Sequence, residues 1–163
     1  MTWIISTENI QQEDGQRVGG KGYALALLAK GGFAVPKTLC VTSQTYQEYV
    51  RRTGLRERIL LELNRKSFKD MRWEEIWDCA TRIRNMFLRK PIPADISGQL
   101  KQAIHAAFHD KAVVVRSSAP EEDDAVSSFA GLHESYVNIQ GTDAILEHIS
   151  KVWASLWSDA ALL

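Results

Sequence analysis

The segment VVVRSSAPEEDDAVSSFAG, residues 113–131, constrains the fold of this chain more than any other stretch. Residues 113–115 form a β-branched run that is typical of a strand in a sheet. Arg116 follows directly, and a guanidinium is rarely buried without a partner. Its side chain is therefore expected to point outward, to pair with an acid such as Glu121 or Glu122, or to reach into a cleft toward a ligand anion.

The residues that follow Arg116 bear on this choice. The hydroxyls of Ser117 and Ser118 stand beside the guanidinium in sequence, and such hydroxyls are common neighbours of phosphate, which favours a ligand role. The acids of PEEDD, residues 120–124, are predicted to form a solvated loop, because carboxylates at adjacent positions do not face one point. The segment by itself leaves the role of Arg116 open.

A second constraint is the glycine-rich stretch VGGKGYALALLAKGG, residues 18–32. Its glycines open an Ala/Leu-rich helix, which Gly31 and Gly32 are predicted to close. Lys21 stands where the loop becomes the helix, and there the free backbone N–H groups and the helix dipole favour anions. Phosphate binding is the functional hypothesis for this stretch, and a flexible loop with a solvated lysine is the alternative.

The same stretch partly fits a P-loop. Gly15, Gly20 and Lys21 satisfy the first part of the pattern G-x-x-x-x-G-K. The pattern fails at Gly22, where Ser or Thr should supply a hydroxyl for magnesium. It also fails upstream, because residues 7–15 separate the glycines from the nearest predicted strand. A P-loop NTPase is therefore only the third hypothesis.

Short strands and amphipathic helices are predicted along the rest of the chain. The strands are TWIIS at residues 2–6, FAVPKTLCVTS at 33–43 and ESYVNIQG at 134–141. Ser43 is predicted to cap a helix that Gly54 ends, with more helix up to Leu63. Thr142 is predicted to cap the last helix. Three helices carry a periodic apolar face, at Trp73, Ile76, Ala80, Ile83 and Phe87, at Ile96, Leu100, Ile104 and Phe108, and at Ile145, Ile149, Val152 and Leu156.

The composition excludes several function classes. The 163 residues are 45% hydrophobic and 25% charged, as in an ordinary soluble globular protein, with one domain as the default. The 20 basic residues balance 20 acidic residues, so no overall charge draws the chain to nucleic acid or to a membrane surface. Trp153 and Trp157 are predicted to be core residues rather than a base-stacking platform.

Cysteines, histidines and the N-terminus narrow the setting further. Cys40 and Cys79 are predicted to be reduced, buried thiols, and the four histidines form no ligand cluster, so no metal site is predicted within the chain. The N-terminus has no basic region followed by an apolar one, and no apolar run approaches the roughly 18 residues of a membrane span. These features predict a cytoplasmic protein.

Taken together, residues 18–50 and 113–139 resemble the N-terminal nucleotide-binding region of phosphoenolpyruvate synthase and its relatives. These relatives are pyruvate phosphate dikinase, the rifampin phosphotransferases and the glucan water dikinases. The resemblance covers nearly the whole chain and is least distinctive over residues 55–110. It implies an α+β fold that is the N-terminal subdomain of an ATP-grasp unit, with a mixed sheet packed with helices and ATP held between two subdomains.

The resemblance also assigns residues. Lys21 and Arg116 match the lysine and arginine that contact the ATP phosphates, and they are the catalytic candidates. Gly131, Glu134 and Ser135 match the strand and turn that line the same cleft. The expected cofactors are ATP and Mg²⁺, with the magnesium carboxylates in the second subdomain, outside this chain.

The same resemblance predicts a fragment. The family relays phosphate through a histidine in a later domain, and neither that segment nor the second subdomain is recognisable in residues 1–163. The apolar ending SLWSDAALL supports this expectation. Residues 1–163 are thus predicted to be the N-terminal part of the ATP-binding domain of a larger protein, inactive by themselves.

Two function classes follow. The first is the ATP-binding part of a phosphotransferase that resembles phosphoenolpyruvate synthase, in which the relayed phosphoryl group reaches pyruvate or another small acceptor, such as a drug or a glucan. The second is a noncatalytic nucleotide-binding or interaction module with the same fold, which uses ATP as an effector. The residues do not identify the acceptor.

Overall fold

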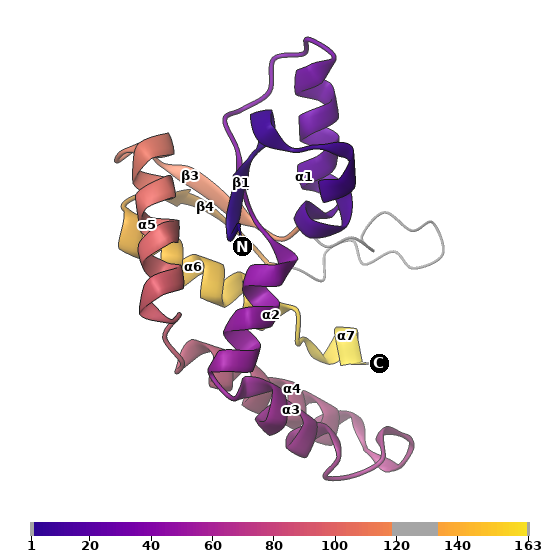
Figure 1. Cartoon of the computed structure of the whole chain (residues 1–163). Coiled ribbons are helices and arrows are strands. Elements are labelled where there is room, and N and C mark those ends of the chain that lie inside the picture. Colours follow the sequence, from indigo (N-terminus) through magenta and orange to yellow (C-terminus); the bar gives the residue numbers. More distant parts are fainter. Residues whose placement is uncertain (1, 119–133, 163) are drawn as a thin grey trace.

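Helices make up most of the molecule, and short strands join them (Figure 1). The structure, a computed structural model, describes residues 2–118 and 134–162. The strands are β1 (Ile4–Ser6), β2 (Leu39–Val41), β3 (Val113–Arg116) and β4 (Ser135–Ile139). The α-helices are α1 (Gly15–Lys30), α2 (Ser43–Arg52), α3 (Leu55–Leu63), α4 (Trp73–Leu88), α5 (Ala94–Phe108), α6 (Thr142–Ser155) and α7 (Asp159–Leu162). The short 3₁₀ turns are η1 (Thr7–Asn9), η2 (Gln12–Asp14) and η3 (Phe68–Asp70).

The strands form two separate antiparallel pairs. β1 pairs with β2, with Ile5 opposite Cys40, and β3 pairs with β4, with Arg116 opposite Ser135. The α+β class is confirmed, but the prediction of one mixed sheet is wrong for the residues that the structure describes. The physical reason is that α2 to α5 follow β2 and build a body of their own, so that β3 meets β4 rather than the first pair.

The main core belongs to the helical body, which we define as α2 to α6. Phe87 of α4 is fully buried, and its ring packs 6.0 Å, between ring centroids, from each of Tyr46 and Tyr49. The Tyr49 hydroxyl donates to the backbone oxygens of Phe87 and Lys90 at 3.2 and 2.9 Å, so the ring carries no unpaired polar group. Trp153 of α6 is buried in the same core, as predicted.

The predicted apolar faces are largely confirmed. The buried positions are Ile76, Ala80, Ile83 and Phe87 of α4, Ile96, Leu100 and Ile104 of α5, and Ile145, Ile149 and Val152 of α6. Phe108 and Leu156 are half-buried. Trp73 is the exception, with 59% of its surface exposed. Trp73 is the first residue of α4, and Ile76 is the first residue of this helix that is buried. The Trp73 ring therefore does not belong to the core cluster.

Two predicted helix caps are wrong by one residue. Thr42, rather than Ser43, precedes α2, and its hydroxyl accepts from the Thr45 N–H at 3.4 Å. Gly141, rather than Thr142, precedes α6, where the backbone has φ +88°. A positive φ favours glycine over threonine at that position, which explains the difference.

A second, smaller apolar cluster holds α1 against β1 and β2. Its buried members are Ile5, Ile10, Val18, Ala26 and Cys40. In Figure 1, α1 and β1 occupy the upper part of the molecule, and α3 and α4 the lower part. The chain passes from the upper part to the lower part through α2 and returns through α5, which leads into β3.

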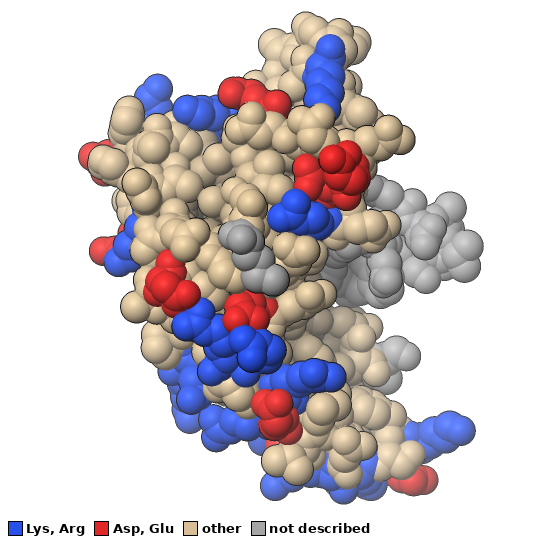
Figure 2. Space-filling view, in the orientation of Figure 1, with Lys and Arg blue, Asp and Glu red and all other residues tan. Residues whose placement is uncertain are grey.

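Charge is divided unevenly between these parts. Residues 51–90, which include α3 and α4, carry twelve of the 20 basic residues and only six of the 20 acidic ones. Figure 2 shows Lys and Arg side chains gathered over the lower half of the molecule.

Among the described residues, no helix is both long and apolar enough to cross a membrane.

Candidate functional site

The glycine motif forms a break inside α1. Gly19 has φ 75° and ψ 166°, which is not helical, so the chain leaves the helix there and enters it again at Gly20. Only glycine adopts this conformation without strain. Lys21 therefore stands in the first turn of a new helical segment, as the sequence predicted for a loop that becomes a helix.

The strand end that carries Arg116 packs directly on this break. The Ser118 hydroxyl accepts from the Gly22 N–H at 3.0 Å and donates to the Val18 oxygen at 2.8 Å. A Cβ atom on Gly19 would lie 1.7 Å from the Ser118 backbone oxygen, so only glycine permits the contact. We call residues 18–22 together with Ser118 the glycine junction. It joins two segments that lie 96 residues apart in sequence.

The junction changes the role expected for the paired serines. The Ser118 hydroxyl was predicted to neighbour a phosphate, but both hydrogen bonds at that oxygen hold the glycine motif in place. Ser117 is buried, with 6% of its surface exposed. The Ser118 hydroxyl therefore positions the backbone. The sequence signal for it was the run of glycines, which allows two backbones to approach closely.

Lys21 belongs to the junction, and Arg116 stands close to it in sequence. Lys21 precedes Gly22 and is half-buried, and Arg116 stands two residues before Ser118 and is exposed. No described residue forms a hydrogen bond or an ion pair with the Arg116 guanidinium. Its proposed partners Glu121 and Glu122 lie outside the described residues, as does the PEEDD loop.

The β3–β4 pair divides the remaining candidates between two faces. Arg116 and Ser135 are register partners, and both are exposed. Tyr136 points the opposite way, with its ring 4.8 Å, between centroids, from the His148 ring of α6. The Tyr136 hydroxyl donates to the Glu134 carboxylate, so Glu134 shares the α6 face.

The structure thus brings Arg116 and Ser135 together, holds the segment of Lys21 against the end of β3 through Ser118, and places Glu134 on the other side of the strand pair. The fifth predicted residue, Gly131, lies outside the described residues.

The space next to Gly22 is also filled. A Cβ atom there would lie 2.8 Å from the Cys40 sulfur of β2. Cys40 is buried, and burial raises the pKa of its thiol to about 11, so the thiol packs rather than reacts. Both cysteines are free and buried, as predicted.

This packing counts against the P-loop hypothesis. Gly22, where a P-loop has its hydroxyl, has no room for a side chain. Gly15 follows the η2 turn rather than a strand, and it begins a helix.

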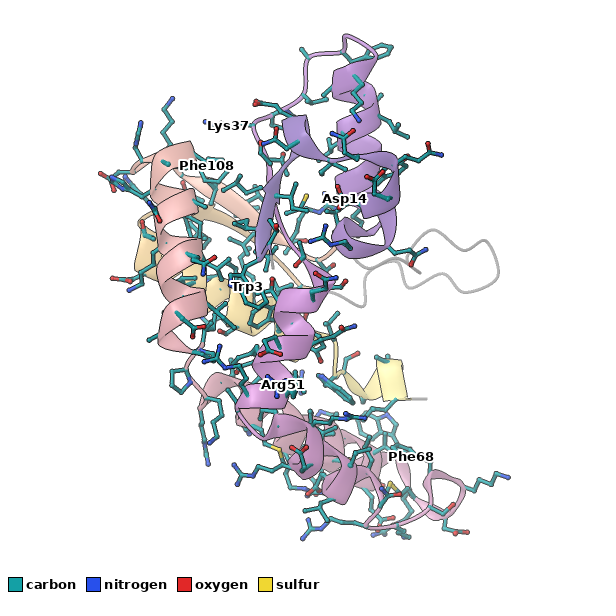
Figure 3. All side chains as sticks on the ribbon, in the orientation of Figure 1. Trp3, Asp14, Lys37, Arg51, Phe68 and Phe108 are labelled. Atoms are coloured by element: carbon teal, nitrogen blue, oxygen red, sulfur yellow. The ribbon has the colours of Figure 1, made fainter. Side chains whose placement is uncertain are left out.

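Asp14 secures the entry into α1. Its carboxylate accepts from the Gln11 N–H at 3.0 Å and pairs with the Arg17 guanidinium at 2.6 Å. The Gln11 N–H, and after it Arg17, hold the pKa of Asp14 below its usual value. Figure 3 shows Asp14 beside the lower part of α1, next to the segment that carries the break. The helix turn before Gly19 is therefore fixed by polar contacts.

The described residues offer no complete magnesium site. No group of three or more His, Cys, Asp or Glu side chains in this part of the chain is arranged to hold a metal ion. Glu134, the one acid among the candidates, already accepts a hydrogen bond from Tyr136.

Comparison with known proteins agrees with the two motifs. A family model described as the pyruvate phosphate dikinase AMP/ATP-binding domain matches residues 15–163. The chain belongs to this family. The match includes both the glycine junction and the β3–β4 pair. The resemblance predicted from the two motifs is therefore confirmed.

The similar proteins are of two kinds, rifampicin phosphotransferases and phosphoenolpyruvate synthases. The rifampicin phosphotransferase of Bacillus subtilis (strain 168) is 35% identical over 161 residues, which are 98% of this chain and 18% of that protein. The phosphoenolpyruvate synthases of Pseudomonas aeruginosa (strain UCBPP-PA14) and Aeropyrum pernix are 31% identical over 167 residues and 34% identical over 164. Each of these two alignments covers 98% of this chain, but only 21% and 20% of the respective synthase. The chain thus spans about a fifth of the length of the curated relatives it matches.

Proposed function

We propose that this chain binds the phosphates of ATP between Lys21 and Arg116, as the N-terminal part of an ATP-grasp unit. One observation carries the proposal: Ser118 holds the glycine motif against the end of β3, so the two cations belong to adjoining segments. The AMP/ATP-binding family gives the ligand class. Ser135, opposite Arg116, belongs to the same wall of the proposed cleft.

The proposed chemistry is electrostatic. Phosphoryl transfer requires the enzyme mainly to position the groups and to neutralise the phosphate oxygens. Arg116 is suited to this task because its fork-shaped guanidinium can donate two parallel hydrogen bonds to one phosphate. Lys21 adds a mobile point charge at a helix N-terminus, where the backbone also favours anions. Magnesium, held by carboxylates outside the described residues, would neutralise further charge on the triphosphate.

For the longer protein, we propose ATP-dependent phosphotransfer through a histidine relay. Residues 1–163 would form the N-terminal part of its ATP-binding domain, and the acceptor would be pyruvate or another small molecule. The relatives do not favour one acceptor, because rifampicin phosphotransferases and phosphoenolpyruvate synthases match at similar identity, 35% and 31–34%. A cytoplasmic location stays a prediction.

Calorimetric titration of ATP into the chain tests the phosphate clamp. Lys21→Ala and Arg116→Ala should each weaken binding about tenfold or more, because a charge-assisted hydrogen bond contributes about 1.5–3 kcal/mol. The unsubstituted chain itself should bind weakly, since half of the proposed cleft lies elsewhere.

Two matched controls keep this test specific. Lys37→Ala changes a lysine on the loop between α1 and β2, labelled in Figure 3, and Arg56→Ala changes an exposed arginine of α3. Both should leave ATP affinity unchanged. Equal affinity for all five proteins would refute the clamp.

The noncatalytic alternative makes a different prediction for the full-length protein. A phosphotransferase incubated with ATP and pyruvate, or with ATP and rifampicin, should form a phosphohistidine and consume the acceptor. An effector-binding module should bind ATP with neither outcome. Detection of phosphohistidine by phosphorus NMR separates the two.

A further inference from the structure

A pocket lies on the α6 side of the β3–β4 pair. It has a volume of about 280 Å³ and opens between α4, the start of β4 and α6. Its polar lining includes Arg84 and Asn85 of α4, Tyr136 of β4 and Lys151 of α6. We call it the α4–α6 pocket. Arg116 and Ser135 are not among its lining residues, so it is separate from the proposed phosphate clamp.

Arg84 is the most informative group in this pocket. It is half-buried, and its guanidinium donates one hydrogen bond, to the Thr81 hydroxyl at 3.3 Å. Among the described residues, no carboxylate pairs with it. Arg17, which is also half-buried, pairs with Asp14 at 2.6 Å. A partly desolvated guanidinium without an acid is suited to a bound anion.

Lys151 supplies a second positive charge at the same pocket. Its ammonium pairs with the Glu147 carboxylate at 2.8 Å and lies 6.0 Å from the centre of the Tyr136 ring. The one acid that lines the pocket, Glu134, accepts from the Tyr136 hydroxyl. An anion that enters would therefore meet the Arg84 guanidinium, the Lys151 ammonium with its Glu147 partner, and the hydrogen-bonded Glu134 carboxylate.

The surroundings strengthen the positive field. A neighbouring pocket of about 460 Å³ shares Leu88 and Lys151 and adds Arg89 and Lys90 at its rim. Residues 51–90, which supply Arg84, Arg89 and Lys90, carry twelve basic and six acidic residues. Glu147, the partner of Lys151, also lines the neighbouring pocket, so the two pockets together are lined by four basic and two acidic residues. An excess of charge of one sign raises the local concentration of the opposite ion.

We propose that the α4–α6 pocket binds a small molecule through an oxyanion group, a phosphate or a carboxylate, held by Arg84 and Lys151. The Asn85 amide can donate to the same group, and Leu88 offers an apolar contact for the rest of the molecule. The volume, about 280 Å³, lies just below the usual range for ligand sites, about 300–1,000 Å³, which favours a small metabolite over a nucleotide.

NMR titration of the full chain tests this site. Inorganic phosphate and acetate are added in separate series at constant ionic strength, with sodium chloride as the reference. Saturable shifts of the Thr81, Asn85 and Ser155 amide signals are expected in at least one series. Saturation by phosphate alone assigns a phosphate group, and saturation by acetate alone assigns a carboxylate. Shifts that chloride reproduces, or no saturable shift in either series, overturn the proposal.

Variants make the test residue-specific. Arg84→Gln and Lys151→Gln should each weaken binding at least fivefold, and Arg84→Lys should restore part of the loss. Arg58→Gln, which changes an exposed arginine of α3 outside the pocket lining, should have no effect. Arg116→Ala should also have none, and a loss of the anion signal with that variant would place the anion at the ATP clamp and overturn the proposal. Thermal melts by circular dichroism confirm that each variant is folded.

Discussion

The glycine junction and the helical body are stabilised in different ways. At the junction, two backbones meet with almost no side-chain volume between them, and one serine hydroxyl makes two hydrogen bonds across the contact. In the helical body, aromatic and branched side chains fill the space between helices, and Phe87 and Tyr49 are completely buried.

The difference shows where function can be located. A densely packed apolar core leaves no polar groups for a ligand, so it supplies stability and a rigid support. The backbone contact built on glycines is itself buried, but it holds the half-buried Lys21 and the exposed Arg116 on adjoining segments, where both are closer to solvent than the helical core is. The proposed ATP clamp lies at the contact that depends on the smallest side chains.

The largest expected effect is in the helical body. Phe87→Ala removes a fully buried ring that contacts Tyr46, Tyr49 and Trp157, and it should lower the free energy of unfolding by about 3–5 kcal/mol. Urea denaturation measures the change. The adjacent control Leu88→Ala, at a position with 53% exposure, should cost less than about 1 kcal/mol. Similar losses for both variants would contradict the described core.

The next effect is at the glycine junction. Gly19→Ala forces a positive φ on alanine, which costs about 1–3 kcal/mol, and places a methyl group on the Ser118 oxygen. The melting temperature should fall, and ATP affinity should fall about tenfold or more, because Lys21 and Arg116 lose their common support.

Gly98→Ala is the control for that change. An added Cβ on Gly98 of α5 meets nothing within 4 Å, so helix propensity alone should stabilise the protein, by up to about 1 kcal/mol, and leave ATP affinity unchanged. If Gly19→Ala also left both quantities unchanged, the contrast between the two regions would fail.

The smallest effect is a dependence on pH in the helical arm formed by α3 and α4. The Glu75 carboxylate accepts from the Arg72 N–H at 2.8 Å and pairs with Lys66 at 2.9 Å, and these contacts lower its pKa from 4.5 to about 2. A carboxyl whose pKa is lowered by folding stabilises the protein above the unfolded value. That contribution is fully present above about pH 4.5 and is lost as the pH falls toward 2.

Glu75→Gln should therefore flatten the loss of stability between pH 4.5 and pH 2. Urea denaturation at several pH values measures the slope. Glu74→Gln, at the exposed neighbouring position, should leave the slope as it is. If Glu75→Gln lost stability with falling pH as steeply as the unsubstituted protein, the contacts of the Glu75 carboxylate would not stabilise the arm.

Much of the fold follows from local patterns. The apolar faces of α4, α5 and α6 were predictable because each helix repeats buried positions at three and four residues, as at Ile76, Ala80 and Ile83. β3 was predictable from three consecutive valines. Positions at element ends were less predictable, as Trp73 and the caps at Thr42 and Gly141 show, because a residue one place away has nearly the same local sequence.

The candidate site divides in the same manner. The sequence by itself determined where a basic residue stands beside flexible glycine backbone, at Lys21, and where one follows a strand, at Arg116. The match to the AMP/ATP-binding family agrees with that choice of motifs. Only the tertiary structure decided that the Ser118 hydroxyl supports the backbone and that Glu134 faces α6. The reason is that local patterns report the period of a helix or strand, whereas the contacts of the Ser118 hydroxyl with α1 and of the Glu134 N–H with the Ser155 hydroxyl of α6 join residues about 20 to 100 positions apart.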